Sequence, residues 1–272
     1  MTSPREFHRS EGRGLFGIDP AGYDAARPRY PDALFDLLRT RCGLRAAVRT
    51  FEVGPGSGVA TRRLAELGAN PIVAIEPDAA FRPQLESIAS ETGAAIEVHL
   101  AAFEDAELPE ASFDLGVAAT SFHWIAAQAG LAKVASLLCS GGWWAMWWNV
   151  FGDPARADAF HDATVHIFDP LHPSPSGGGA AGGPYALDAA ARLAELESVG
   201  RFEALEAARW DWTLTLDTRQ VRALYATFSS IIRLDERERE KALDTVADVA
   251  ESRFGGRVER NMVTAVYIAR RR

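Results

Sequence analysis

An acid followed by alternating glycines is the stretch whose residue types point most directly to chemistry. Between a short apolar run, 48–53, and a helix-compatible run, 59–67, the chain reads Glu52-Val-Gly-Pro-Gly-Ser-Gly58. Glycines permit positive φ and let a ligand approach the bare backbone. The free N–H groups at the start of the following helix can bind an acceptor atom. This arrangement predicts a nucleotide-type site, with a glycine-rich turn that binds nothing as the alternative.

A second acid, Glu76, ends the next apolar run, 71–76, which we expect to be a parallel strand buried on both faces. It follows Gly54 by 76 − 54 = 22 residues. An acid at the tip of the second strand, near this distance from the glycine turn, usually binds a ribose diol. A carboxylate suits this task because it accepts hydrogen bonds from both hydroxyls. A solvated loop acid is the alternative interpretation.

Polar and aromatic residues also follow the fourth predicted strand, 112–119, in the segment Thr120-Ser-Phe-His-Trp124. Ligands bind at the carboxyl ends of strands in such a sheet, so this segment should face the reactive end of a cofactor. His123 is the candidate general base, and an orienting or packing histidine is the alternative. The two cysteines, Cys42 and Cys139, have neither metal-ligand nor redox spacing, so we predict no metal site.

Three segments together resemble the class I S-adenosyl-L-methionine (SAM)-dependent methyltransferases. The pattern E-x-G-x-G-x-G is similar to motif I of these enzymes. Tyr23-x-x-x-Arg27-Pro-x-Tyr30-Pro, before the first predicted helix, resembles a segment that lies over the cofactor in their small-molecule (methyltransferase type 11-like) branch. The sequence Ala-x-Ser-Phe-His-Trp, at 119–124, resembles the same branch. The resemblance covers about residues 16–269.

The resemblance implies an enzyme that transfers a methyl group from SAM to a small-molecule acceptor. In this branch an acid ahead of a Leu-Pro turn meets the adenine amino group, and Glu104 holds that position here, with Phe103 against the adenine face. The cofactor-binding residues that it implies are Tyr23, Arg27, Glu52, Gly54, Pro55, Gly56, Ser57, Gly58, Glu76, Pro77, Phe103, Glu104, Thr120 and Ser121. The acceptor-binding residues that we expect are Tyr30, His123, Trp124 and Asn149, with His123 as the catalytic candidate.

Two other classes of protein stay open. A nicotinamide-dependent oxidoreductase shares the glycine turn and the acid at 76, but it requires G-x-G-x-x-G. Such an enzyme would also leave an antiparallel end of the sheet unexplained. The other class is a non-catalytic protein of the same fold that binds a partner through a Trp-rich or glycine-rich surface.

Length, composition and charge limit the class further. A chain of 272 residues with 47% apolar and 24% charged residues can form one α/β core with a cap. Its net charge of −8 argues against a general phosphate-backbone binder. No run reaches the roughly 18 apolar residues of a membrane helix, and residues 1–14 do not resemble a signal peptide. We therefore expect a cytoplasmic protein without a nucleic-acid or membrane partner; the oligomeric state stays open.

The hydrophobic patterns predict an α/β fold. We expect a Rossmann-like, doubly wound, seven-stranded and mostly parallel sheet with an antiparallel last strand and helices on both faces. The strands should cover 48–53, 71–76, 95–100, 112–119, 143–150, 209–215 and 262–269. The helices in the second half should cover 126–138, 151–169, 185–207, 217–228 and 235–253.

These elements should form a single domain, 1–272, in four parts. They are an N-terminal arm and helix over the cofactor (1–44), a SAM-binding core (45–150), a cap or lid insertion (151–208), and C-terminal antiparallel strands and helices (209–272). Residues 1–15 are expected to be disordered, and 170–184 to be either a mobile lid edge or a surface loop. Because faces alternate along a strand, Trp144 and Trp148 should lie on one face of 143–150 and Trp143 and Trp147 on the other.

Overall fold

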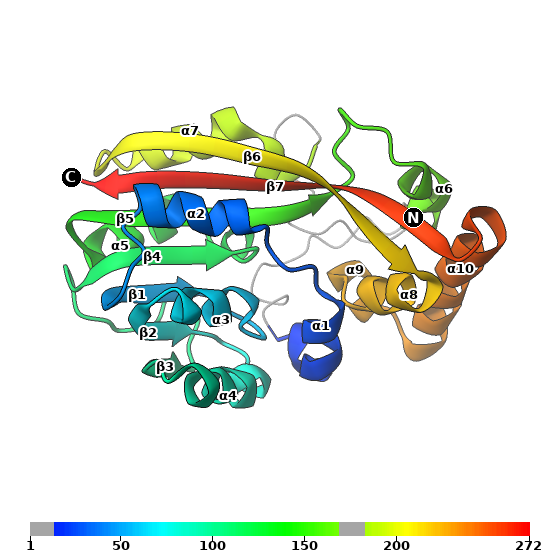
Figure 1. The fold of residues 1–272 in the computed structure, drawn as a ribbon, viewed down its shortest axis with the longest axis horizontal. Coiled ribbons are helices and arrows are strands. Elements are labelled where there is room, and N and C mark those ends of the chain that lie inside the picture. The colour runs from blue at the N-terminus through cyan, green and yellow to red at the C-terminus, as the bar shows by residue number, and fades with distance from the viewer. Residues whose placement is uncertain (1–13, 169–182) are drawn as a thin grey trace, which may run out of the picture.

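The computed structural model describes residues 14–168 and 183–272 (Figure 1). These residues form a seven-stranded sheet with the strand order β3-β2-β1-β4-β5-β7-β6. The strands are β1 (Val48–Val53), β2 (Ala69–Ile75), β3 (Ile96–His99), β4 (Phe113–Ala119), β5 (Leu138–Phe151), β6 (Phe202–Asp217) and β7 (Arg257–Arg271). The first five strands pair in parallel, and β7 is antiparallel to both of its neighbours, β5 and β6. The predicted fold class is therefore confirmed, with the last strand inserted between β5 and the edge strand β6.

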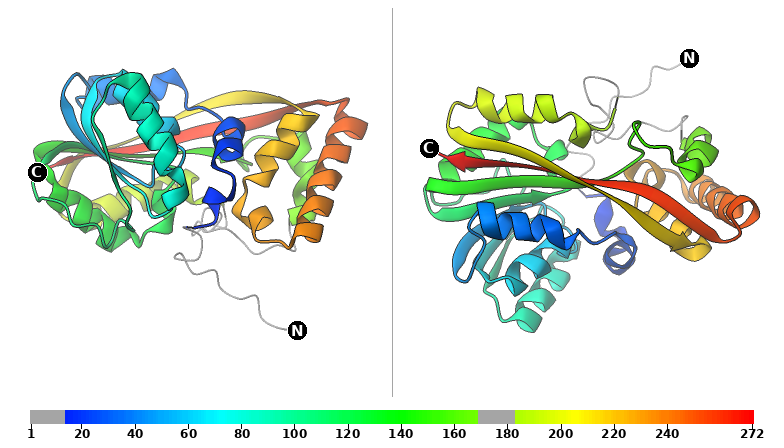
Figure 2. Two further views of the ribbon diagram at one scale, coloured as in Figure 1. Left: turned by 90° about the horizontal axis from the view of Figure 1, so that it is seen from below. Right: turned by 45° about the horizontal axis from the view of Figure 1, so that its top comes forward.

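Helices cover both faces of the sheet (Figure 2). They are α1 (Pro20–Ala26), α2 (Asp32–Arg41), α3 (Val59–Glu66), α4 (Arg82–Thr92), α5 (Ala127–Leu137), α6 (Ala159–Phe168), α7 (Ala189–Ser198), α8 (Thr218–Ala226), α9 (Ser229–Ile232) and α10 (Glu236–Phe254). Leu34 of α2 and Leu64 of α3 are buried in the core of one face. Leu131 of α5 and Leu196 of α7 are buried in the core of the other face. None of the helices described combines the length and the hydrophobicity that a membrane span requires.

The tryptophans of β5 alternate between these two cores. Trp144 and Trp148 lie in the core under α5 and α7. Trp147 is fully buried in the opposite core, and Trp143 packs against that core from its margin. The predicted alternation is confirmed, and it makes β5 the strand that anchors both layers.

The strands β6 and β7 extend well past the rest of the sheet and carry a helical cap, which we define as residues 159–168 and 218–254 (Figures 1 and 2). The cap has a core of its own, which includes Phe160, Leu224, Val246 and Val258. It rests on the far end of the β6–β7 pair rather than on the parallel half of the sheet. The cap is thus a separate helical unit placed beside the carboxyl ends of the parallel strands.

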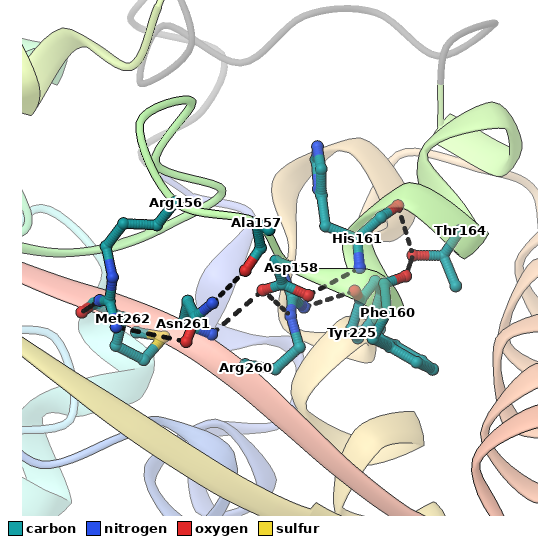
Figure 3. Close-up of polar contacts among 10 residues, drawn as sticks. All are labelled: Arg156, Ala157, Asp158, Phe160, His161, Thr164, Tyr225, Arg260, Asn261 and Met262. Atoms are coloured by element: carbon teal, nitrogen blue, oxygen red, sulfur yellow. Dashed lines mark hydrogen bonds and ion pairs between the residues drawn. The ribbon is translucent and has the colours of Figure 1, made fainter.

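A buried ion pair joins the cap to β7 (Figure 3). The Nε of Arg260 lies 2.8 Å from a carboxylate oxygen of Asp158, and both side chains are 2% exposed. Arg260 also donates from Nη1 to the hydroxyl of Tyr225 in α8, over 2.6 Å. Asp158 accepts from the backbone N–H groups of His161 and Asn261. These bonds satisfy both buried charges and connect three segments at the base of the cap.

Several boundaries in the second half differ from the predicted ones. The helix expected over 185–207 is wrong in its last part, because α7 ends at Ser198, Gly200 adopts φ +69° and β6 begins at Phe202. The helix expected from 151 begins only at Ala159, since Phe151 still pairs with β7. The expectations for 1–15 and 170–184 fall mostly outside the described residues.

Candidate functional site

A cavity of about 400 Å³ opens at the carboxyl ends of the parallel strands. The N-terminal arm, the glycine turn, the end of β4 and the turn after α8 all contribute to its lining. Of the residues predicted to bind cofactor or acceptor, all but Glu52 and Gly58 line this cavity. The structure therefore brings together side chains from separate parts of the sequence, as the strand-end rule requires.

The glycine turn shows why glycine stands at each of its three positions. Gly54, Gly56 and Gly58 have φ of +64°, +56° and +83°, a region that other L residues rarely adopt. A Cβ on Gly54 would lie 2.8 Å from the Cβ of Ser121, and one on Gly58 would lie 2.3 Å from Ile88 of α4. A Cβ on Gly56 would meet no atom within 4 Å. The backbone at Gly56 is therefore open, whereas Gly58 serves helix packing behind the cavity.

The carboxylate of Glu76 lies directly across from this turn. One oxygen accepts from the N–H of Gly56 and the other from the N–H of Asp78, each over 2.9 Å. Burial raises the pKa of Glu76 to about 7, although both backbone bonds act to lower it. Each carboxylate oxygen can accept a further hydrogen bond, so the group can still bind a diol.

Glu52 lies behind the cavity lining and is fully buried. Its Oε2 accepts from the hydroxyl of Thr61 over 2.7 Å, whereas Oε1 has no hydrogen-bond partner. Burial raises the pKa of this carboxyl to about 7, and the charge of Glu76 adds to the effect. Two buried carboxyls thus flank the glycine turn and make this end of the cavity favourable for a cationic ligand.

The adenine-side candidates lie at the loop after β3. Phe103 lines the cavity and is 3% exposed, and its ring stacks against Phe51 with centroids 6.3 Å apart. Glu104 lines the same wall but is exposed to solvent. Pro77 completes this side, next to Glu76. The wall thus offers an apolar face with an acid at its margin.

The N-terminal arm is fixed over the cavity by polar contacts with the ends of strands. Asp24 accepts from the hydroxyl of Ser57 over 3.0 Å. Tyr30 and Thr120 share a hydrogen bond of 2.8 Å between their hydroxyls. Thr120 has φ +56°, an uncommon conformation for a β-branched residue, and such strain is concentrated at functional sites.

Asn149 is engaged on both sides of its amide. The nitrogen donates to the backbone oxygens of Pro28 and Arg29 in the arm, and the oxygen accepts from Thr264 of β7. The indole of Trp212 in β6 donates to the same threonine. Asn149 lines the cavity, and its hydrogen bonds hold the arm in place. Direct contact between Asn149 and an acceptor stays a prediction.

His123 has a defined hydrogen bond in the cavity wall. The indole Nε1 of Trp148 lies 3.0 Å from its Nδ1, and both residues are buried. An indole N–H can only donate, so Nδ1 must be unprotonated and the neutral imidazole carries its proton on Nε2. A histidine in this state cannot accept a proton at Nε2, and accepting one at Nδ1 would break the bond to Trp148. The geometry favours the orienting alternative over the general base.

Residues 51–146 match the family model described as a methyltransferase domain. This range runs from β1 into β5 and includes the glycine turn, Glu76 and His123. An uncharacterised methyltransferase-like protein of Schizosaccharomyces pombe is 24% identical over 245 residues, which cover 87% of this chain and 86% of that protein.

Solved structures share the fold. A candidate type II methyltransferase from Anaeromyxobacter dehalogenans matches with a TM-score of 0.61 at 21% identity, over 90% of this chain and 97% of that one. Phosphoethanolamine N-methyltransferase 2 from Haemonchus contortus, solved with S-adenosyl-L-methionine, matches with a TM-score of 0.59 at 11% identity, over 98% and 60% of the two chains. A methyltransferase domain therefore covers residues 51–146, and the chain shares its fold with solved methyltransferases.

The residues of the cavity fit the chemistry of SAM, the ligand with which the Haemonchus contortus enzyme was solved. The backbone at Gly56 is bare, as a close approach requires. The buried carboxyl of Glu52 lies behind the turn, and the unpartnered Nε of Arg27 gives the arm a donor for a carboxylate. Among residues 14–168 and 183–272, no group of three or more His, Cys, Asp or Glu side chains could hold a metal ion.

Part of the cavity of the methyltransferase was not foreseen from the sequence. Phe228, which precedes α9, and Ser229 and Ser230, the first residues of α9, line the cavity. Phe16 and Phe81 also line it, and the ring of Phe16 meets Trp124 edge to face at 6.0 Å. No local signal marks the 228–230 turn, because its position depends on how far β6 and β7 extend beyond the sheet.

Proposed function

We propose that this methyltransferase transfers the methyl group of SAM to a small-molecule acceptor bound in the aromatic half of the cavity. The observation that carries the proposal is the continuity of the cavity from the glycine turn to a wall of aromatic side chains under the arm. A site of about 400 Å³ that is mostly apolar with a few polar points is typical of small-molecule ligands. A macromolecular acceptor would require an open face instead.

The cofactor half has the residues that such a reaction requires. Glu76 accepts the ribose hydroxyls, Phe103 and Glu104 receive the adenine, and the open backbone at Gly56 receives the methionine part. Tyr23, Arg27, Pro55, Ser57, Pro77, Thr120 and Ser121 complete this half, with Glu52 and Gly58 supporting the turn from behind.

The acceptor half is built from Tyr30, His123 and Trp124, with Tyr185 of the η6 segment (Tyr185–Leu187) beside them. The ring centroids of His123 and Tyr185 are 6.4 Å apart, and Trp148 packs edge to face on Tyr185 at 5.6 Å. His123 positions the acceptor as part of this wall, with its ring held by the hydrogen bond from Trp148 to Nδ1. Asn149 acts indirectly, by holding the arm.

Catalysis rests on alignment. Bound SAM supplies an activated methyl group on a positively charged sulfur. The protein brings the nucleophile into line with that group and excludes water, and such positioning can account for roughly 7–11 kcal/mol of the barrier. Aromatic faces in the acceptor half also suit a cationic centre. No nucleic acid or membrane takes part in this proposal, in keeping with the net charge of −8 and a cytoplasmic location.

Two experiments test the proposal. Calorimetric titration should give binding of SAM and S-adenosylhomocysteine (SAH), but no binding of NADH. Radiolabelled SAM should then transfer its label to at least one member of a metabolite panel, and not to total RNA or to bulk protein. Transfer to RNA or protein alone would refute the small-molecule acceptor while leaving the methyltransferase assignment intact.

A further inference from the structure

The segment 228–230, between α8 and the first residues of α9, is a part of the cavity wall that lies outside the parallel core. Residues 228–230 line the cavity. Their neighbours Leu224 and Ile231 are buried in the separate core of the helical cap. The cap therefore supports residues 228–230. The distance between these residues and the glycine turn also depends on contacts that the N-terminal arm makes with them.

Arg27 makes a contact of this kind. Its Nη2 donates to the backbone oxygen of Thr227 over 2.8 Å. Its guanidinium carbon lies 4.8 Å from the ring centroid of Tyr23 and 5.7 Å from that of Phe228. Arg27 thus ties the arm to Thr227, the residue just before the 228–230 wall, and to the ring of Phe228 within that wall.

The same guanidinium has a donor that is not used. Nε of Arg27 is buried and has no hydrogen-bond partner, and Arg27 lines the cavity. A buried N–H without an acceptor has lost its water without compensation. A carboxylate is the group that a guanidinium binds best, and the methionine part of SAM carries one. Asp24, on the same arm, is bonded to Ser57 and keeps this segment beside the glycine turn.

We propose that Arg27 couples cofactor binding to the placement of the 228–230 wall, an inference that rests on the proposed function. When Nε receives the cofactor's carboxylate, the guanidinium is held in one orientation, and its Nη2 then holds Thr227 and the turn that follows. The acceptor half of the cavity is complete only in the cofactor complex, so the cofactor binds before the acceptor. By linkage, an acceptor that contacts this wall strengthens cofactor binding by the same factor.

Amide hydrogen exchange tests the coupling without knowledge of the acceptor. The N–H groups of Phe228, Ile231 and Ile232 donate to backbone oxygens within the turn and report on its opening. Saturating SAH should slow exchange in a peptide covering 226–233 by about five-fold or more. 5′-Methylthioadenosine keeps the adenine, ribose and thioether but lacks the carboxylate, so it should bind without slowing this peptide.

Two variants complete the experiment. Arg27→Gln should bind 5′-methylthioadenosine as the wild type does and should lose the effect of saturating SAH on residues 226–233. Arg29→Gln removes an exposed charge from the same arm and should keep the effect. Equal slowing by both ligands, or an SAH effect retained in Arg27→Gln, would overturn the coupling. A folded wild type that binds neither ligand would instead refute the proposed function.

Discussion

Replacing Glu76 with glutamine removes one charge from the cofactor half and gives two measurable effects. The first is on cofactor affinity. Glutamine has one acceptor oxygen where glutamate has two, so at least one ribose hydroxyl is left unpaired, a loss of about 1–3 kcal/mol. This corresponds to SAH binding that is weaker by about 5- to 150-fold, measured by calorimetric titration at neutral pH.

The second effect is on stability and follows from the raised pKa of Glu76. Burial moves this pKa from 4.5 to about 7, so the folded state holds the proton more tightly than the unfolded chain. The wild type must then lose stability as the pH rises from about 4.5 to about 7, by about 3 kcal/mol in total. The glutamine of the variant cannot ionise, so the variant lacks this loss. As the pH rises from about 4.5 to about 7, the stability of the variant relative to the wild type should therefore increase.

Urea denaturation at each pH measures this difference in the free energy of unfolding. Glu52 adds its own pH dependence to the stability of both proteins, so its contribution largely cancels in the difference. Unchanged SAH affinity in a folded Glu76→Gln protein would refute the ribose assignment. If the stability difference between the two proteins is constant with pH, the pKa of Glu76 is not raised, and its carboxylate is better solvated than its burial indicates.

Three further outcomes are expected. Asp158→Asn should lower the free energy of unfolding, measured with urea, by about 3–5 kcal/mol, because it leaves the buried guanidinium of Arg260 without its carboxylate. Glu259→Gln removes the exposed ion pair with Arg257 and should lower the free energy of unfolding by less than about 1 kcal/mol. In nitrogen-15-labelled wild type, long-range proton–nitrogen spectra should show His123 with its proton on Nε2, and Trp148→Phe should abolish this preference; a proton on Nδ1 in the wild type would contradict the geometry. Trp124→Ala should reduce turnover of whichever metabolite is methylated while SAM binding changes little; loss of SAM binding in a folded protein would show that the two halves of the cavity are wrongly divided.

Local sequence was enough to predict the parallel half of the fold and most of the residues that line the cavity at its strand ends. The glycine turn, the acid that ends β2 and the segment after β4 are each read from a few adjacent residues, and the strand-end rule then brings them together. The capping of α8 was also readable: Asp217 and Gln220 form a capping box at its start. In such places the local pattern and the tertiary contacts agree.

The features that the sequence did not reveal depend on partners far along the chain. The sequence left His123 open as a general base or an orienting histidine, and only the position of Trp148, on the neighbouring strand, shows which ring nitrogen accepts a hydrogen bond. The hydrogen bonds of the Asn149 amide with the arm and with Thr264 could not be predicted, because both partners are distant in sequence. The helix expected through residue 207 fails because the last residues of that segment pair with β7, a long-range contact that outweighs local helix propensity.

The pairing of β6 with β7 has a consequence for how this protein could change its acceptor. Asp217, the last residue of β6, is the register partner of Arg257, the first residue of β7. The segment between them, 218–256, therefore leaves and re-enters the sheet at points only about 5 Å apart, and it contains the Phe228–Ser230 wall of the cavity. A segment with adjacent ends can be exchanged as a cassette without a change in strand register or in the glycine turn. Diversification of acceptors, in evolution or by grafting, can thus proceed at this one junction while the cofactor half is inherited intact.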